Sequence, residues 1–246
     1  TATTEIYTLS LHDALPIYIS FIKSHLWFFV GISQLFAVLS CQTLRNHSPS
    51  SPLGVYWINP LSSSQISPLQ VYCDMETDGG GWTLAWSYTF KNYSHFTDVS
   101  NAVTPRPNWL VDQDADVGNS TTPPLHETDY NAINFSLWKQ LGSQVLVKSN
   151  INNWLVCHPK SGSLVLWQDG SVGCQIIIHV TDTCNETKAP TKLSRTGYFG
   201  PMFQGNNFYS FDGSTEQNFP THDPCGNGEG NQLKNVIDLH GDIYVR

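Results

Sequence analysis

Six cysteines constrain the fold of this chain more than any other feature of its sequence, and they lie at Cys41, Cys73, Cys157, Cys174, Cys184 and Cys225. They form no Cys-x-x-Cys pair and no histidine stands at zinc-ligand spacing, so the pattern predicts disulfides rather than a zinc site. Fifteen pairings of six cysteines are formally possible. Short sequence separation favours Cys41–Cys73 and Cys157–Cys174, which leaves Cys184–Cys225. Each bond of this kind contributes about 3 kcal/mol by restricting the unfolded chain.

The first forty residues differ in character from the rest. Residues 1–17 resemble one reading frame of a short-read sequencing adapter, and the only methionines are Met75 and Met202. Residues 18–40 contain an apolar run at 26–39 that follows a lysine and a histidine. That run is shorter than the roughly 20 residues of a membrane span and is typical of a secretory signal.

The sequence therefore divides into three segments. We expect a translated adapter at 1–17, a signal peptide at 18–40 and a secreted, extracellular domain at 41–246. The alternatives for the second segment are a buried helix, an untranslated stretch read through from the adapter, and an uncleaved signal anchor. The anchor is the one route by which the chain would contact a membrane.

Composition excludes several classes of protein. The formal net charge is −8 at pH 7, and the 12 Lys and Arg residues form no basic run. This argues against binding to nucleic acid or to an anionic membrane surface. Aromatic residues make up 12% of the chain, including eight Trp, which is enough for a sizeable core and excludes global disorder.

Hydrophobic patterning predicts one α+β domain over residues 41–246 in which strands dominate. Residues 82–88 alternate large apolar with small or polar side chains, which is typical of a strand with one aromatic face toward a core. One short helix is expected at 134–141. Strands are expected at 54–58, 69–75, 82–88, 144–148, 154–158, 163–168, 175–180, 207–211, 235–239 and 242–245. Loops or irregular segments are expected at 90–125, 183–201 and 217–232.

Asn-x-Ser/Thr sites for glycosylation are abundant, and they lie at Asn46, Asn92, Asn119, Asn134 and Asn185. A chain this rich in Asn, Ser and Thr produces several such sites by chance, so they support secretion only weakly. A glycan at any of them would mark a surface position.

The opening of the domain resembles that of fibrinogen-like domains, which fibrinogens, ficolins, tenascins and intelectins share. After Cys41 come Gly54-Val-Tyr56, Val71-Tyr-Cys-Asp-Met-Glu-Thr77 and Gly79-Gly-Gly-Trp-Thr-Leu84 at fixed spacing. The resemblance implies a strand-dominated α+β fold with disulfides and long loops. Later stretches resemble a group of skeletal organic matrix proteins from stony corals, and they lie at 101–109, 148–154 and 220–226.

The fibrinogen-like resemblance implies a secreted binding module for carbohydrate or glycoprotein ligands, often with calcium nearby. Asp212, Asp223, Asn227 and Glu229 lie around Cys225 and offer the oxygen ligands that calcium prefers. The paired Asp-x-Asp of the family's calcium loop is absent. A disulfide-anchored surface loop, in which Asp, Asn and Gly serve turns, is the alternative.

Aromatic and histidine side chains near this late loop are candidates for contacts with a ligand. Aromatic faces pack against the C–H surface of sugar rings, and His222, Tyr209 and Phe211 are the residues that we expect to do so. The alternative for the two aromatic residues is a place in the core.

Two further motifs, one acidic and one rich in glycine, are better explained as parts of loops than as binding sites. Asp112-x-Asp114-x-Asp116 has the alternating carboxylates of a calcium clamp, but without the rest of an EF-hand loop it is better explained as a solvated acidic turn. Gly226-x-Gly228-x-Gly230 follows no hydrophobic strand and opens no helix, which excludes a dinucleotide site.

The sequence does not predict an enzyme, because it holds no Gly-x-Ser-x-Gly, no His-Glu-x-x-His and no isolated reactive cysteine. We expect a secreted recognition domain that binds carbohydrate or glycoprotein ligands with calcium. The alternative is a structural component of an extracellular or biomineral matrix without a defined sugar pocket. Homo-oligomers are expected for a lectin of this kind, since they supply avidity.

Overall fold

An antiparallel sheet organises the molecule, whose structure is a computed structural model. It describes residues 30–61, 67–89, 105–110, 118–180, 188–197, 200–205, 208–211, 221–223, 233 and 235–246. Within these residues eleven strands form one sheet in the order β1-β2-β3-β13-β6-β7-β8-β9-β10-β11-β12. The strand-dominated α+β fold predicted from the sequence is confirmed.

The elements have the following bounds. The strands are β1 (Gly54–Ile58), β2 (Leu69–Asp74), β3 (Trp82–Thr89), β4 (Arg106–Pro107), β5 (Asn119–Ser120), β6 (Val145–Ser149), β7 (Trp154–Pro159), β8 (Gly170–Ile178), β9 (Lys192–Gly197), β10 (Gly200–Gln204), β11 (Phe208–Ser210), β12 (Thr221–Asp223) and β13 (His240–Val245). The α-helices are α2 (Cys41–His47) and α3 (Trp138–Leu141), and the 3-10 helices are η2 (Gln34–Phe36), η3 (Thr77–Gly79) and η4 (Phe135–Leu137).

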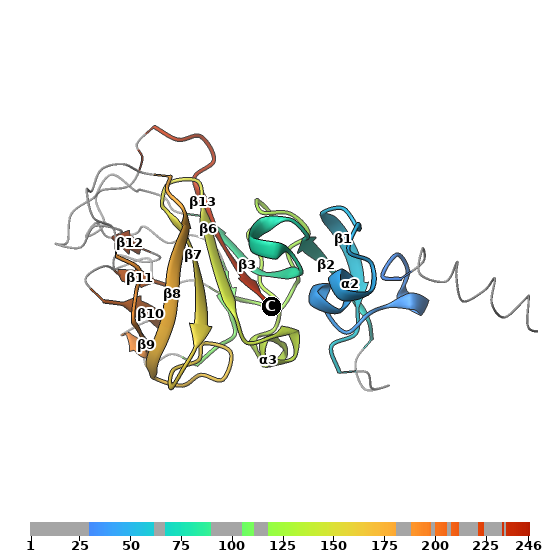
Figure 1. Ribbon diagram of the computed structural model, residues 1–246, viewed down its shortest axis with the longest axis horizontal. Helices are drawn as coiled ribbons and strands as arrows, with labels where there is room; N and C mark the ends of the chain where they lie inside the picture. The colour runs from blue at the N-terminus through green and yellow to red at the C-terminus, as the bar shows by residue number, and fades with distance from the viewer. Residues whose placement is uncertain are drawn as a thin grey trace, which may run out of the picture.

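The strand latest in sequence lies near the middle of the sheet. β13 pairs antiparallel with β3 on one side, where Asp242 faces Ser87, and with β6 on the other, where Asp242 faces Lys148. Figure 1 shows β13 running between these two strands, with β1, β2 and α2 at one end of the molecule and β8 to β12 at the other. The two ends of the sheet are therefore joined through β13.

Two disulfides tie neighbouring elements together, as the sequence predicted. Cys41, the first residue of α2, bonds to Cys73 in β2 with a Cα–Cα distance of 5.5 Å. Cys157 in β7 bonds to Cys174, its directly paired neighbour in β8. The expected third pair, Cys184–Cys225, lies outside the described residues.

β3 contains a bulge that divides its aromatic side chains between two cores. The register with β13 shifts between Ile243, which faces Trp86, and Tyr244, which faces Leu84. A bulge of this type disrupts strict alternation along a strand. Trp82 and Leu84 therefore pack in a small core with Tyr244, whereas Trp86 packs in the main core. The single aromatic face expected from the sequence is wrong, because strict period two does not continue through a bulge.

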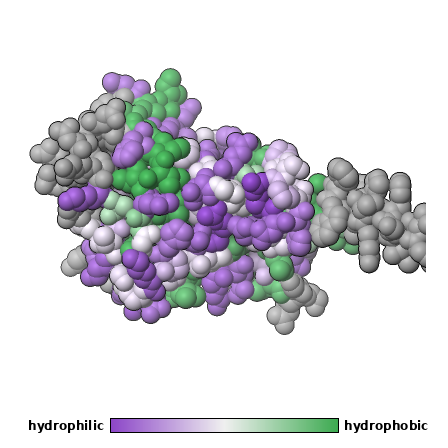
Figure 2. Space-filling view, viewed as in Figure 1, coloured by the Kyte–Doolittle hydropathy of each residue, from purple (hydrophilic) through white to green (hydrophobic). Residues whose placement is uncertain are grey.

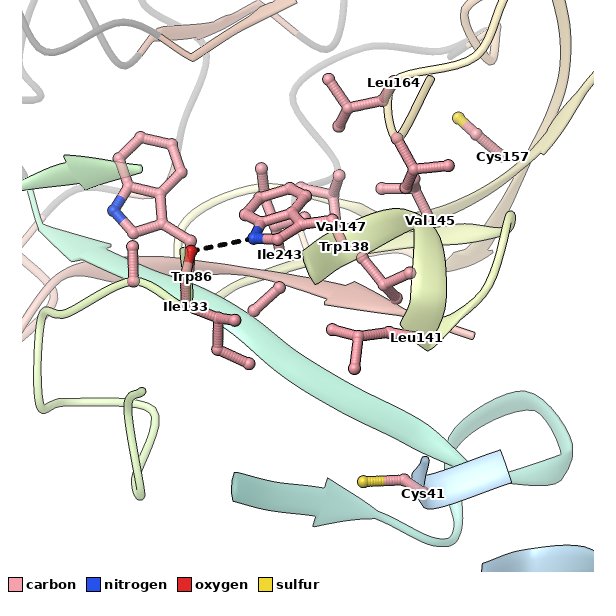
Figure 3. Packing of buried hydrophobic residues seen from close by; sticks show 14 of the residues in the cluster. Cys41, Trp86, Ile133, Trp138, Leu141, Val145, Val147, Cys157, Leu164 and Ile243 are labelled. Carbon is pink, nitrogen blue, oxygen red and sulfur yellow. Dashed lines mark hydrogen bonds between the residues drawn. The ribbon is translucent and has the colours of Figure 1, made fainter. Parts of the chain in front are cut away.

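The main core is built around tryptophan rings, and the indole N–H groups of Trp86 and Trp138 are paired, whereas that of Trp109 has no partner among the described residues. The Trp138 indole packs among aliphatic side chains from β6 and β13, and its Nε1 donates a 3.0 Å hydrogen bond to the Ile133 carbonyl oxygen (Figure 3). Trp86 Nε1 donates at 3.0 Å to the carbonyl oxygen of Pro105. Burying an indole with its N–H satisfied avoids the cost of an unpaired donor.

Several elements differ from those expected. Residues 163–168, expected as a strand, form a tight turn in which Ser163 and Gln168 exchange backbone hydrogen bonds, and Trp167 has a φ of +53°. Residues 235–239, also expected as a strand, form a turn with positive φ at Asn235 and Asp238. In both segments the apolar residues suggested a strand, but the chain turns: backbone hydrogen bonds close the turn at 163–168, and residues with positive φ reverse the chain at 235–239. α2 was not expected, and neither were β9, β10 and β12 within segments taken as irregular or loop.

Part of the segment assigned to the signal peptide contacts β1. Val38 is buried, its N–H donates to the Trp57 carbonyl at 3.2 Å and its carbonyl accepts from Asn59 N at 2.6 Å. Ser40 is the N-cap of α2, with its hydroxyl accepting from Thr43 N at 3.2 Å. The boundaries at 17 and 40 stay predictions. Among the described residues, no helix combines the length and apolar character needed to cross a membrane.

The surface is mainly polar in the view of Figure 2, with apolar side chains gathered over the upper end of β8 and the turn before β13. Ile178 in β8 is 41% exposed and Ile237 in that turn is 84% exposed. Val236 and Leu239 of the same turn are partly buried against the main core, so Ile237 is the apolar side chain of residues 235–239 that faces solvent.

Gly80→Ala is expected to destabilise the fold, because Gly80 has a φ of +73° and an added Cβ would overlap the Met75 carbonyl group. The left-handed backbone alone costs about 1–2 kcal/mol for a residue with a side chain, and the overlap adds to this. Urea unfolding of the oxidised chain measures the loss. Gly118→Ala is the control, since nothing lies within 4 Å of its added Cβ. Equal stability of the two variants would contradict the steric argument.

Candidate functional site

A group of charged and polar side chains lies where the centre of the sheet meets the loop before η4. β13 contributes three residues, β6 one, β2 one and the loop one. We call them the β13 cluster: Asp74, Glu127, Lys148, His240, Asp242 and Tyr244. Asp242 and Tyr244 are two residues apart and so share a face of β13, and Lys148 faces Asp242 across the strand pair.

Lys148 holds this cluster together. Its Nζ lies 2.6 Å from Glu127 Oε1 and 3.2 Å from Asp74 Oδ2, and only 12% of its side chain is exposed. The ammonium also lies 4.6 Å from the Trp154 ring centroid and 5.1 Å from that of Tyr244. Burial lowers the pKa of Lys148, but the attraction of Glu127 and Asp74 outweighs burial and the net shift is upward. Lys148 therefore stays charged at neutral pH.

Asp74 connects the cluster to the glycine-rich turn. Its Oδ1 accepts from Glu76 N at 3.0 Å and Thr77 N at 2.9 Å, and its Oδ2 accepts from the Thr77 hydroxyl at 2.6 Å. Burial raises the pKa of Asp74, but the Thr77 and Glu76 hydrogen bonds together with Lys148 outweigh it and the net shift is downward. The aspartate of the Tyr-Cys-Asp-Met motif thus has a structural role as the acceptor that closes this turn.

Glu127 uses one oxygen for two donors. Glu127 Oε1 accepts from Lys148 Nζ at 2.6 Å and from the Tyr244 hydroxyl at 2.5 Å. Burial raises the pKa of Glu127, but the charge and hydrogen bond of Lys148 outweigh it and the net shift is downward. The second carboxylate oxygen, Oε2, is not engaged by either of these donors.

His240 and Asp242 form the least satisfied part of the cluster. His240 Nδ1 lies 2.7 Å from the Asp238 carbonyl oxygen, and its Nε2 lies 3.6 Å from Asp242 Oδ2. The Asp242 side chain is 1% exposed, and neither carboxylate oxygen has a hydrogen-bond partner in the described part of the chain. Burial raises the pKa of Asp242 well above its usual range, and the charge of Glu127 adds to this.

The side chains of Glu127, His240 and Asp242 converge on one space. One ligand atom from each, two carboxylate oxygens and one imidazole nitrogen, lies within 4.8 Å of the others. These are atom types that bind divalent metal ions in proteins. The arrangement can therefore hold a cation.

The predicted calcium ligands are not the residues of this cluster. Asp212, Asn227 and Glu229 lie outside the described residues, as do Asp112, Asp114 and Asp116. Asp223 and His222 lie in β12, where the structure describes the backbone alone. The late-loop calcium site therefore remains a prediction.

Tyr209 and Phe211, expected to contact a ligand, are fully buried. The Phe211 ring packs edge-on against Tyr88 and Phe203, with centroids 6.1 and 6.0 Å away. Both rings therefore lie in the core, and their contact with a ligand stays a prediction.

The predicted glycosylation sites differ in exposure. Asn46 and Asn119 are exposed, whereas Asn134 is half-buried and its Oδ1 accepts from Ser136 N as the N-cap of η4. Asn92 and Asn185 lie outside the described residues.

Sequence analysis missed the β13 cluster. Glu127, Lys148 and His240 belong to no local motif, and they meet only through the pairing of β13 with its neighbours. One signal was present in the sequence. Asp242 begins the strand predicted at 242–245, whose other residues are apolar or aromatic, and a charged residue is rarely buried in such a strand without a partner.

Comparisons of the sequence with known proteins match short parts of the chain. The family model for the C-terminal globular domain of fibrinogen beta and gamma chains matches residues 40–92. The chain is 61% identical over 31 residues to Techylectin-5A of Tachypleus tridentatus, which is 13% of this chain and 11% of that protein. It is 41% identical over 59 residues to fibrinogen-like protein A of Apostichopus parvimensis, which is 19% of this chain and 21% of that protein.

A structural comparison covers more of the chain. The fibrinogen-like globe domain of human ANGPTL6 is 11% identical with a TM-score of 0.37, over 85% of this chain and 95% of that one. The matched segments span about a fifth or less of the curated relatives. The fibrinogen-like resemblance found in the sequence is confirmed, and the family match lies on residues 40–92.

Lys148→Met is expected to destabilise the chain by roughly 3 kcal/mol, since it leaves two partly buried carboxylates without their shared cation. Lys139→Met in α3 is the matched control, because Lys139 is exposed. Chemical denaturation of both variants measures the difference. An effect of Lys148→Met no larger than that of the control would show that the ion pairs contribute nothing net.

Proposed function

We propose that this chain is a secreted recognition domain that binds carbohydrate or glycoprotein ligands non-covalently, with calcium held by the late loop. The observation that carries the proposal is the 61% identity over 31 residues to Techylectin-5A, a lectin by name, together with the match of residues 40–92 to the fibrinogen family model. Fibrinogen-like domains are a recognition and structural fold.

The disulfides support a place outside the cell. Two of them are part of the sheet and its first helix, and such bonds form and persist in oxidising, extracellular compartments. Cys41–Cys73 joins α2 to β2, so the segment that matches the family model is also closed by a covalent bond. We infer that the chain is folded and used after secretion.

The chemistry of the late loop supports calcium. Calcium takes six to eight oxygen ligands from carboxylates, amides, backbone carbonyls and water. Asp212, Asp223, Asn227 and Glu229 supply four side chains of this kind, and the neighbouring glycines allow backbone carbonyls to approach. A sugar hydroxyl pair is an oxygen ligand of the same type, so a calcium ion with open positions would bind sugar directly.

Affinity chromatography tests the proposal. The full chain, produced by secretion, is expected to bind an N-acetylglucosamine resin in calcium and to elute with a chelator. Glu229→Gln is expected to reduce retention at least tenfold, because it removes one carboxylate ligand. Glu76→Gln is the control, since Glu76 is exposed in the turn after β2, at the opposite end of the sheet from β12.

Two results would contradict this function. Retention that persists in chelator would remove calcium from the mechanism. Absence of binding to this resin and to a panel of other glycans, combined with self-association of the chain, would favour the structural matrix protein that the sequence left as the alternative.

A further inference from the structure

The hydrogen bonds of His240 place a lone pair opposite a carboxylate. The Asp238 carbonyl oxygen can only accept, so His240 Nδ1, 2.7 Å away, must carry the proton. In the neutral ring the other nitrogen, Nε2, is then an acceptor, and it lies 3.6 Å from Asp242 Oδ2. Two acceptors that face each other require a positive charge between them, either a proton or a metal ion.

Asp242 is poorly compensated: burial raises its pKa and outweighs Ser87 and the charge of Lys148, which lower it, so the net shift is upward. Both of its oxygens lack a hydrogen-bond donor within the described residues, and its side chain is 1% exposed. The Ser87 hydroxyl, on the residue paired with Asp242 in β3, donates to the Glu127 carbonyl oxygen, so its proton is not available to either Asp242 oxygen at the same time. A buried carboxylate without donors is costly, so this side chain points to a missing partner.

The charge balance of the β13 cluster gives the valence of that partner. Three carboxylates, those of Asp74, Glu127 and Asp242, share the single ammonium of Lys148. Burial disfavours the ionised form of Asp242, whereas a bound cation favours it. In that ionised state, with His240 neutral, two negative charges are left over. One divalent cation neutralises them.

We propose that Glu127, His240 and Asp242 bind a divalent transition-metal ion of the zinc class, at a site distinct from the late-loop calcium. Imidazole nitrogen with carboxylate oxygen is a donor set for zinc, whereas calcium takes six to eight oxygens. Bonds of about 2.0–2.2 Å at tetrahedral angles place neighbouring ligand atoms roughly 3.3–3.6 Å apart. The 3.6 Å between His240 Nε2 and Asp242 Oδ2 already meets this spacing.

The groups around these ligands hold them for metal binding. The Asp238 carbonyl fixes the His240 tautomer, as second-layer acceptors do for metal-bound histidines. Asn150 fixes the turn, because its Oδ1 accepts from His240 N at 2.8 Å and its Nδ2 donates to Asp238 O at 2.9 Å. Lys148 and Tyr244 bind Oε1 of Glu127, which leaves Oε2 for the ion.

The site is also open to solvent on one side. The Glu127 side chain is 28% exposed and that of His240 is 16% exposed, whereas Asp242 forms the closed floor. A metal ion can therefore enter from the side of Glu127, and water can complete its coordination. Three protein ligands with an open fourth position would also allow a ligand oxygen to reach the ion.

Calorimetric titration of the full, metal-stripped chain with Zn²⁺ tests the site. We expect one tight Zn²⁺ per chain, a rise in Tm of about 5 °C at a hundredfold excess over Kd, and no competition from millimolar Ca²⁺. Co²⁺ bound in its place is expected to give the intense visible bands of a four-coordinate ion.

Three variants assign the ligands. Asp242→Asn and His240→Gln are expected to weaken Zn²⁺ binding at least tenfold. Asp242→Asn is also expected to keep or raise the metal-free Tm, because it removes an uncompensated carboxylate, which separates loss of binding from loss of folding. His158→Gln controls for zinc bound at an exposed histidine and should bind like the parent chain.

Several results would overturn the site. These are the absence of stoichiometric Zn²⁺, unchanged binding by Asp242→Asn, loss of binding by His158→Gln alone, or equal affinity for Ca²⁺. Retention on the N-acetylglucosamine resin by Asp242→Asn reports separately on the recognition function, so failure of one proposal is distinguishable from failure of the other.

Discussion

The pairing of β13 with β3 and β6 is the interaction on which the rest of the structure depends. It joins the disulfide-bonded part formed by α2, β1 and β2 to the strands that follow β6. Arg246, directly after β13, extends this connection: its Nη1 donates to the carbonyl oxygens of Asp78 and Gly80, and its guanidinium lies 4.0 Å from the Trp82 ring centroid. Its own carbonyl accepts from residues 143 and 144. One segment thus fixes the glycine-rich turn, the small core and the start of β6.

The same strand places a buried charge, that of Asp242, in the middle of the sheet. A central strand is buried on both faces, yet Asp242 stands in the middle of β13 and Lys148 stands beside it in β6. Lys148 is satisfied by two carboxylates and two aromatic rings, so its burial is well compensated. The burial of Asp242 is not compensated in this way, since neither carboxylate oxygen has a hydrogen-bond partner among the described residues. The excess negative charge is confined to the part of the sheet that the Glu127 loop covers. Asp242 therefore affects both the stability of the fold and the proposed binding of a metal ion.

Local chemistry made part of this fold predictable from the sequence. The span of β1 and two disulfides follow from short-range pattern and spacing. Two turns were taken for strands, because apolar side chains such as Leu164 and Val165 are buried there without a strand partner beyond a single bridge. The bulge in β3 and the β13 cluster depend on which strands become neighbours. Single-sequence patterns do not contain that information, since the cluster joins residues from 74 to 244.

The place of β13 has a consequence for biosynthesis. During vectorial synthesis β3 and β6 are complete long before residues 240–245 leave the ribosome, so each waits with one row of unpaired backbone groups. Such open edges pair readily with other chains, and long-range strand pairing is slow. The nascent chain must therefore be protected from pairing with other chains until residues 240–245 have been synthesised. A chain that terminates before β13 lacks the strand that pairs with both β3 and β6, so the two parts of the sheet stay unconnected.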